Sequence, residues 1–298
     1  MSDKQKVLVI VGATASGKTG LAVELAKQFD GEVISADSRQ VYRKLNIGTA
    51  KVTKEEMQGV PHHFIDVVDI SDVYTAADFV RDGRAAIADI TARGKLPIIA
   101  GGTFFYVDLL LGRLSMPEVA PNPTLRGKLE KMSTEDLHAE LRERDSARAA
   151  TIDPNNKRRL IRALEIVAAI GHVPAIPTEE LYDTLWLGTE RSKDDLRERI
   201  TKRANSWLHG GFKDEVAWLL AQDCTPERLA EFGFEYTIGA AWVQGELTNE
   251  QFVEQFLAKN WQYAKRQLTW LQKNDEVNWL QPDTVGAAQK LVTNWLED

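Results

Sequence analysis

The chain has little cysteine, little histidine and no long apolar run. Cys224 is the single cysteine among 298 residues, so no internal disulfide can form. The five histidines lack cysteine neighbours at the spacing of a structural zinc site. No segment approaches the roughly 18 consecutive apolar residues of a membrane-spanning helix, and residues 1–6 lack the basic and apolar regions of a signal peptide. We therefore expect a cytoplasmic protein with no membrane partner.

The chain also lacks an excess of positive charge. Lys and Arg number 37 against 44 Asp and Glu, which gives a formal net charge of −7. Because phosphate contacts need clustered cations, this balance argues against indiscriminate nucleic-acid binding, and any RNA site must be local. The hydrophobic content of 43% is enough to fill a sizeable core, so the chain should fold alone.

A phosphate-binding loop is predicted near the start of the chain. Residues 6–11 form a short apolar run, and residues 21–29 carry apolar side chains at helical spacing. We expect the loop between them to hold phosphate oxygens with its backbone amides, Lys18 to reach a second phosphate and the Thr19 hydroxyl to bind Mg²⁺. The segment fits G-x-x-x-x-G-K-T in the required strand, loop, helix context: Gly12, Ala13, Thr14, Ala15, Ser16, Gly17, Lys18 and Thr19.

Strands and helices alternate beyond this loop. An amphipathic helix is expected at 75–93, and strands are expected at 32–35, 96–100 and 184–187. The alternation predicts an α/β fold, a P-loop NTPase-like parallel sheet flanked by helices. Later helices are predicted at 196–208, 212–220 and 249–271, with a capping box of Thr248 and Gln251 before the last. Most of the eight tryptophans, which all lie from Trp186 onward, are expected in the core.

A helical insertion interrupts the pattern. From about Met116 three prolines precede charged helical segments, and no strand is evident before 184. We therefore divide the chain into a P-loop core, residues 1–115 plus 184–298, and a helical insertion, residues 116–183. Asp153 followed by Pro154 predicts a helix start. That helix carries a basic cluster of Lys157, Arg158, Arg159 and Arg162.

Two polar residues should lie at the carboxyl edge of the sheet. Asp37 follows the second strand directly, and Thr103 follows the strand at 96–100. Asp37 is either a helix N-cap or a general base, and Thr103 either caps the next helix or takes part in the site. The strand at 96–100 ends in Gly101, Gly102 and Thr103 rather than in an Asp for Mg²⁺, which disfavours a switch-type NTPase.

The order and spacing of several motifs resemble the tRNA dimethylallyltransferase family. They are the phosphate loop, Asp37-Ser38-x-Gln40-x-Tyr42, Gly48-Thr49-Ala50-Lys51, Pro61-His62-His63, Gly101-Gly102-Thr103-x-x-Tyr106, Arg158-Arg159-Leu160-x-Arg162-Ala163-Leu164-Glu165 and Gln262-Tyr263-Ala264-Lys265-Arg266-Gln267-x-x-Trp270. The resemblance covers nearly the whole chain. Ala13 replaces the usual proline, and Glu235 stands where the family usually has Arg or Lys. No zinc-finger module follows the core, so the resemblance is to the bacterial type.

The resemblance implies a prenyl transfer. The loop would hold the diphosphate of dimethylallyl diphosphate, with Lys18, Mg²⁺ at Thr19 and Arg203 stabilising the charge on the leaving group. Asp37 would accept a proton from the adenine N6, with Thr103 hydrogen-bonding the same region. The acceptor would be the adenosine on the 3′ side of the anticodon, position 37 of the tRNA, flipped into the cavity.

The resemblance also implies where tRNA binds. Gln40 would read the flipped adenine through its amide, and Lys265 and Arg266 are further candidates for phosphate contacts. His62 and His63 are expected to pack or to form hydrogen bonds. The residues expected to contact tRNA are Asp37, Ser38, Arg39, Gln40, Thr103, Arg126, Arg158, Arg159, Leu160, Ile161 and Arg162.

Two other functions fit parts of the sequence. A P-loop kinase for a small molecule would use Asp37 to bind the substrate or as the base, but it would leave the Thr103 and late-helix motifs unexplained. A non-catalytic RNA-binding module would use nucleotide occupancy as a switch. The sequence leaves open whether ATP binds and which tRNA species are accepted, and a monomer is the default expectation.

Overall fold

A computed structural model describes residues 4–281 and 284–298. The chain divides into two compact units, a core unit of Met1–Leu111 with Glu180–Asp298 and an insertion unit of Gly112–Glu179. The sequence placed this division at 116 and 183. Backbone hydrogen bonds close the junction, from Glu179 N to Gly112 O and from Leu181 N to Leu111 O.

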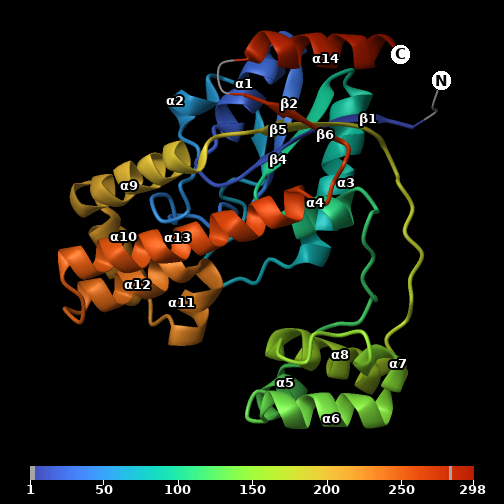
Figure 1. Cartoon of the computed structure of the whole chain (residues 1–298), viewed down its shortest axis with the longest axis vertical. Helices are drawn as coiled ribbons and strands as arrows, with labels where there is room; N and C mark the ends of the chain where they lie inside the picture. Colours follow the sequence, from blue (N-terminus) through green and yellow to red (C-terminus); the bar gives the residue numbers. More distant parts are fainter. Residues whose placement is uncertain (1–3, 282–283) are drawn as a thin grey trace. The chain divides into compact units, whose positions relative to one another are not determined.

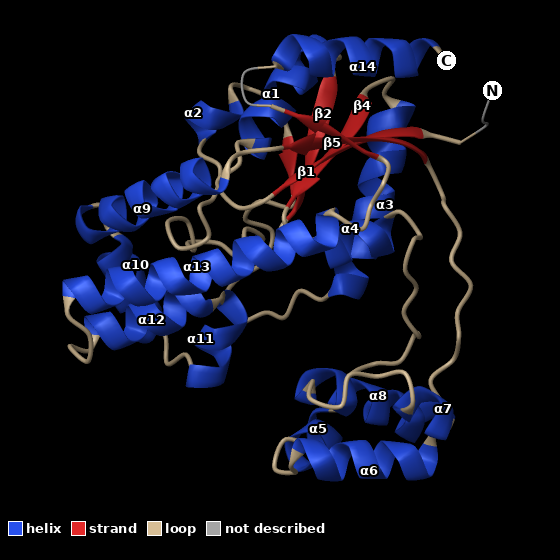
Figure 2. Ribbon diagram, in the orientation of Figure 1, coloured by secondary structure: helices blue, strands red, loops and turns tan. Residues whose placement is uncertain are grey.

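The core unit is built on a six-stranded sheet in which every pairing is parallel (Figure 2). The strand order is β3-β2-β4-β1-β5-β6, so the strand that leads into the phosphate loop lies inside the sheet. The predicted α/β fold is confirmed. The strands are β1 (Lys6–Gly12), β2 (Gly31–Ala36), β3 (His62–His63), β4 (Leu96–Gly101), β5 (Asp183–Thr189) and β6 (Val277–Leu280).

Alternating side chains of β1 face opposite sides of the sheet. Leu8 and Ile10 pack in a buried cluster with α1 (Lys18–Gln28) and α14 (Val285–Glu297), which lie together in Figure 1. Val7, Val9 and Val11 pack in a second cluster with α3 (Ala76–Ala92) and α4 (Phe104–Leu110). Helices therefore cover both faces, which is the arrangement expected of a parallel sheet. A short helix, α2 (Lys54–Met57), follows the loop after β2.

A helical subdomain within the core unit has its own aromatic core. It contains Trp207, Phe212, Phe232, Phe252 and Phe256, all buried. The predicted bounds of α13 match the structure, and the predicted capping box before it is present. Trp186 and Trp242 are also buried, but Trp279 is 39% exposed and the other four tryptophans are half-buried, so fewer of the eight lie in the core than expected. The helices are α9 (Lys193–His209), α10 (Phe212–Leu220), α11 (Pro226–Phe232), α12 (Phe234–Val243) and α13 (Asn249–Leu271).

The insertion unit is helical, with a separate hydrophobic core that includes Leu137, Leu141 and Leu160. Its helices are α5 (Pro123–Leu129), α6 (Thr134–Arg144), α7 (Ser146–Ala149) and α8 (Lys157–Ile170). None of the helices in the described ranges is long and apolar enough to span a membrane.

The predicted start of the helix in the insertion unit was wrong. Helix α8 begins at Lys157, with Asn156 as its N-cap, and the Asn156 side chain accepts a hydrogen bond from Arg159 N at 3.1 Å. Asp153 instead accepts from Asn155 N at 3.0 Å. The Asp153 side chain therefore closes a turn ahead of the helix, because aspartate bonds its own following backbone as readily as it caps a helix.

Candidate active site

The phosphate loop joins β1 to α1 at the carboxyl edge of the sheet. A side chain at Gly12 would clash with the hydroxyls of Thr189 and Ser16, so this position needs glycine. The first helical residue is Lys18, so the amides that precede it stand at the positive end of α1. Such an arrangement attracts an anion.

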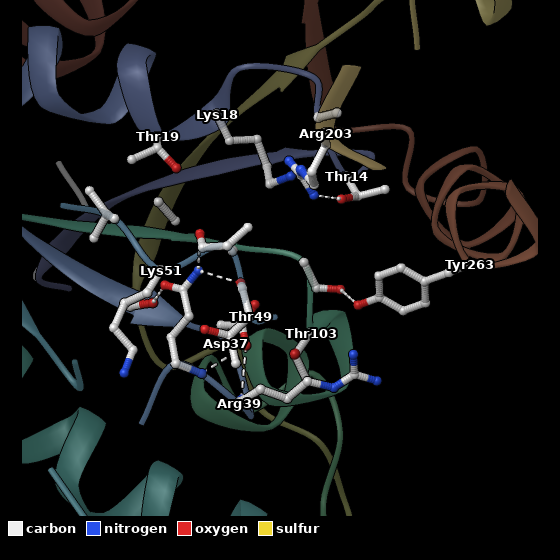
Figure 3. Close-up of a pocket in the computed structure, with 18 of the residues that line it drawn as sticks. Thr14, Lys18, Thr19, Asp37, Arg39, Thr49, Lys51, Thr103, Arg203 and Tyr263 are labelled. Carbon is white, nitrogen blue, oxygen red and sulfur yellow. Dashed lines mark hydrogen bonds between the residues drawn. The ribbon is translucent and has the colours of Figure 1, made fainter. Parts of the chain in front are cut away.

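Two cations from different elements meet at this loop (Figure 3). The Lys18 ammonium donates to the Ala13 carbonyl at 2.7 Å, and Arg203 of α9 donates to the Thr14 hydroxyl at 3.3 Å. Although part of the Lys18 surface stays accessible, the surrounding protein lowers its pKa to about 8, chiefly through burial. Asp37 opposes this shift and Arg203 adds to it. Burial also lowers the pKa of Arg203. A bound anion would favour the charged forms of both side chains and so raise both pKa values.

Thr19 fits the role expected for a Mg²⁺ ligand. Its side chain lines the same cavity as Lys18. Within residues 4–281 and 284–298 its hydroxyl has no hydrogen-bond partner, so it is available to a cation held by phosphate oxygens. The Mg²⁺ site itself stays a prediction.

Asp37 and Thr103 come together at the same edge of the sheet, as expected from their positions after two strands, and the structure shows that these strands, β2 and β4, are neighbours. One carboxylate oxygen of Asp37, Oδ1, accepts from the backbone amides of Arg39 at 2.8 Å and Gln40 at 3.2 Å. Thr103 is the N-cap residue of α4, but its hydroxyl accepts from Ser38 N at 3.3 Å and makes no cap hydrogen bond. Neither side chain is therefore a helix cap, and both hold the turn after β2.

A cavity of about 1370 Å³ connects these groups. The phosphate loop, the Asp37 turn, residues 46–53, the end of β4 and parts of α9 and α13 line it. Typical small-molecule pockets are roughly 300–1000 Å³. The cavity therefore has room for a diphosphate donor together with a flipped base.

Helix α13 contributes residues to which the sequence assigned no individual role. Gln267 accepts from Thr14 N at 2.7 Å and donates to Gly102 O at 3.1 Å, and the Tyr263 hydroxyl donates to the same carbonyl at 3.4 Å. Their membership of the late-helix motif was the only indication in the sequence. Helix α13 thus joins the phosphate loop to the end of β4.

The loop of residues 45–51 is also tied to the core unit from two sides. Glu215 of α10 accepts from the amides of Asn46, Ile47 and Gly48 at 2.7–2.9 Å. Lys51 donates to Asp66 at 2.5 Å and to the Tyr42 carbonyl at 2.6 Å. Glu215 belongs to none of the motifs, so the sequence did not indicate it.

Gln40 uses its side-chain amide within the protein. The amide nitrogen donates to the carbonyls of Thr49 at 3.3 Å and Ala50 at 3.1 Å, and the oxygen accepts from Ser35 at 3.3 Å. Adenine recognition by Gln40 stays a prediction that requires these bonds to rearrange. Arg39 likewise forms an ion pair with Glu235 at 2.7 Å instead of being free for phosphate.

In the insertion unit a buried carboxylate holds two of the arginines that are expected to contact tRNA. Glu165 accepts from Arg126 at 2.7 Å and from Arg162 at 3.4 Å, while Arg162 also donates to the Val119 carbonyl at 2.6 Å. Burial works to raise the pKa of Glu165, but the Arg126 hydrogen bond leads the contacts that hold it below the usual value. Arg158 and Arg159 are exposed.

Two of the residues expected to contact tRNA are buried. Leu160 and Ile161 are 0% and 6% exposed and pack in the core of the insertion unit, because the helix turns these positions inward. Both side chains pack inside the insertion unit, and contact between these two residues and tRNA stays a prediction.

His62 and His63 form hydrogen bonds, as expected. His62 Nδ1 lies 2.9 Å from the Val60 carbonyl, and His63 Nε2 lies 2.9 Å from Glu32. Hydrogen bonds from Arg93 and His63 outweigh burial and lower the pKa of Glu32 to about 2. His63, on β3, therefore shares the Glu32 carboxylate of β2 with Arg93.

Comparison with known proteins decides the family. The IPP transferase family profile matches residues 40–274. The chain belongs to the IPP transferase family. A tRNA dimethylallyltransferase of Thermomicrobium roseum is 42% identical over 286 residues, which cover 94% of this chain and 87% of that protein. One from Enterococcus faecalis is 40% identical over 306 residues and covers 98% of each chain.

Solved structures of the family agree. The tRNA isopentenylpyrophosphate transferase of Bacillus halodurans has a TM-score of 0.74 and 35% identity, covering 99% of this chain and 97% of that one. A eukaryotic dimethylallyltransferase acting on tRNA has a TM-score of 0.80 and 31% identity, covering 93% of this chain and 74% of that one. The family predicted from the motifs is confirmed, which favours the transferase over the kinase and the RNA-binding module.

Proposed function

We propose that this protein transfers the dimethylallyl group of dimethylallyl diphosphate to N6 of the adenosine at position 37 of tRNA. The observation that carries the proposal is that one cavity holds both a cationic phosphate loop and the Asp37 carboxylate. A kinase would need the same loop for ATP, whereas the relatives are named for transfer to tRNA.

The cations at the phosphate loop would bind the diphosphate and stabilise it as it leaves. Lys18 and Arg203 approach the loop from two helices, α1 and α9, so that they can neutralise different oxygens. Negative charge grows on the bridging oxygen as the allylic C–O bond breaks, and positioned cations stabilise that charge most. Mg²⁺ bound at Thr19 would supply further neutralisation of the diphosphate.

Asp37 would be the general base. Its Oδ1 is committed to the turn, while Oδ2 accepts none of the hydrogen bonds found among the described residues. As the N6–C bond forms, the N6 proton passes to Asp37 and the electron pair of the C–O bond leaves with the diphosphate. Thr103, which holds the same turn, would fix the position of the adenine relative to Asp37.

The insertion unit would supply further contacts to the RNA. Arg158 and Arg159 are exposed, and Arg126 and Arg162 are held in place by Glu165. Preorganised arginines suit phosphate recognition because less side-chain entropy is lost on binding. We further propose that the protein acts in the cytoplasm as a monomer, with all residues of the site supplied by one chain.

The test is incubation of the protein with Mg²⁺, labelled dimethylallyl diphosphate and unmodified tRNA, followed by nucleoside analysis. We expect label in N6-dimethylallyladenosine. Asp37→Ala should slow the single-turnover rate by about a hundredfold or more and should lower tRNA affinity far less. Asp275→Ala, an exposed aspartate, is the matched control. Phosphorylation of a metabolite by ATP without any transfer of label would overturn the proposal.

A further inference from the structure

A buried ion pair stands in the cavity beside the Asp37 turn. Glu235, in the first turn of α12, has a side chain only 10% exposed, and its Oε2 lies 2.7 Å from Arg39 Nη1. The Arg39 guanidinium carbon also lies 5.8 Å from the ring centre of Phe234 and 5.9 Å from that of Tyr263. Three contacts therefore direct the Arg39 side chain from the turn toward the Tyr263 side of the cavity (Figure 3).

The backbone next to α12 is shaped around this pair. Gly233 has a φ of +130°, and a Cβ there would lie 2.5 Å from both Arg39 Nη1 and Glu235 Oε2. A residue other than glycine would displace the pair as well as strain the backbone. The close approach of the Arg39 and Glu235 side chains therefore depends on glycine at position 233.

Arg39 links this pair to Asp37. Its backbone amide donates to Asp37 Oδ1 at 2.8 Å, so the residue that holds the turn also carries the guanidinium. Burial opposes the charge on Arg39, but Glu235 first and Asp37 second keep its pKa above the usual value. Burial raises the pKa of Glu235, and Arg39 is the main group that opposes the shift. Two carboxylates therefore compete for one guanidinium.

We propose that Glu235 is a positioning residue for the transfer reaction, which acts through Arg39 by keeping its guanidinium away from the Asp37 carboxylate. The inference rests on the proposed role of Asp37 as base. A guanidinium paired directly with Asp37 would favour the ionised carboxylate and so weaken it as a proton acceptor. With Glu235 in place, Arg39 holds the turn while most of its charge is neutralised elsewhere.

Other charged and titratable groups also act on Asp37 or on the pair, and each stays unchanged in the variants below. Lys18, Lys51, Tyr106 and Tyr263 interact electrostatically with Asp37, and Arg203 with Glu235. Tyr236 interacts with both members of the pair, and Glu235 also interacts with Asp37 directly. The double variant at 39 and 235 is therefore needed to show that Arg39 takes part in the effect.

The experiment measures single-turnover transfer against pH with saturating dimethylallyl diphosphate and tRNA. Glu235→Gln keeps the shape of the side chain but removes its charge. We expect the rate to fall about tenfold and the acid limb of the pH profile to move to lower pH, as follows from a weaker base. Glu235→Asp, which keeps the charge, should retain the limb of the unaltered protein. Glu254→Gln, an exposed glutamate on α13, is the matched control.

The double variant Arg39→Gln with Glu235→Gln removes both charges and should recover most of the lost rate and the original limb. A double variant no faster than Glu235→Gln, or an unchanged limb in Glu235→Gln, would overturn the inference. Asp37→Asn tests the role of Asp37 as base separately from the role of Glu235 as positioning residue. If Asp37→Asn is slow while Glu235→Gln is normal, only the role of Glu235 is lost. If Asp37→Asn transfers normally, the base assignment in the proposed function fails as well.

Discussion

Gln267 and the Thr14 backbone amide are joined by a hydrogen bond of 2.7 Å across 253 residues of sequence. The same side chain donates to the Gly102 carbonyl at 3.1 Å. One amide of the phosphate loop is therefore used by the protein rather than left for phosphate. Through Gln267, α13 fixes the distance between the loop and the strand end that carries Thr103.

Gln267→Ala should loosen this connection without unfolding the protein. Each lost hydrogen bond is worth about 1 kcal/mol, so kcat/KM for dimethylallyl diphosphate should fall by about tenfold or somewhat more. Steady-state kinetics with tRNA at saturation measure the effect. Gln255→Ala, an exposed glutamine on the same helix, should behave like the unaltered protein. Equal kinetics for both variants would show that α13 does not position the loop.

Diphosphate binding should depend on the protonation of Lys18. Because its pKa in the free protein is about 8, affinity for inorganic diphosphate should fall as the pH rises through 8. Calorimetric titration at several pH values measures the affinity. Lys18→Met should bind weakly at every pH and lose the pH dependence. A Lys18→Met protein that still showed the same decline near pH 8 would assign it to another group.

Lys18 should also affect the stability of the free protein. Its pKa is lowered from 10.5 to about 8 on folding, so the unfolded chain holds more protons between those values. The contribution of Lys18 to the free energy of unfolding therefore rises with pH across this window. The free energy of unfolding of Lys18→Met minus that of the unaltered protein should therefore be larger at pH 7 than at pH 10. Denaturant unfolding at the two pH values tests the sign, and an equal difference at both would contradict it.

Glu215→Gln should loosen the loop of residues 45–51. The carboxylate accepts hydrogen bonds from three backbone amides and from the Tyr236 hydroxyl. Hydrogen bonds to a charged group are worth about 1.5–3 kcal/mol each. We expect the free energy of unfolding to fall by about 2 kcal/mol and hydrogen exchange at Gly48 to accelerate. Glu246→Gln, at an exposed glutamate, should change neither quantity. Unaltered exchange at Gly48 would argue against this anchoring.

Arg158 and Arg159 should contribute to the salt dependence of tRNA binding. Each phosphate contact adds roughly 0.7–0.9 to the slope of log K against log salt concentration. Replacing both with Gln should therefore reduce the slope by about 1.4–1.8. Binding measured at four or more salt concentrations gives the slope. Arg142→Gln, an exposed arginine on α6, serves as the comparison, and an equal slope in all three proteins would remove the pair from the interface.

Local patterns predicted the features that depend on a few neighbouring residues. The phosphate loop, the capping box at Thr248 and the α13 bounds all follow from short-range geometry, and the structure has them. Strands β3 and β6 are two and four residues long, too short for a periodicity to be detected. The helix start expected at Asp153 was wrong, because the same side chain closes a turn and the helix begins at Lys157.

The contacts that the sequence did not reveal are between distant residues. Glu235 was recognised as an unusual charge, but charge alone does not show that its partner is Arg39, 196 residues away. Glu215 has no motif around it and acts through backbone amides, which leave no trace in side-chain composition. Positions that depend on the tertiary pairing of two segments therefore needed the structure.

The closed junction of the insertion has an evolutionary consequence. Gly112 and Glu179 are hydrogen-bonded to each other, and Leu111 and Leu181 continue the pairing on the core side. Each unit also keeps its hydrophobic cluster to itself. A segment with adjoining ends and a self-contained interior can be lengthened, shortened or exchanged as a unit while the sheet of the core unit stays intact. Sequence changes inside the insertion and inside the core unit can therefore accumulate independently of each other.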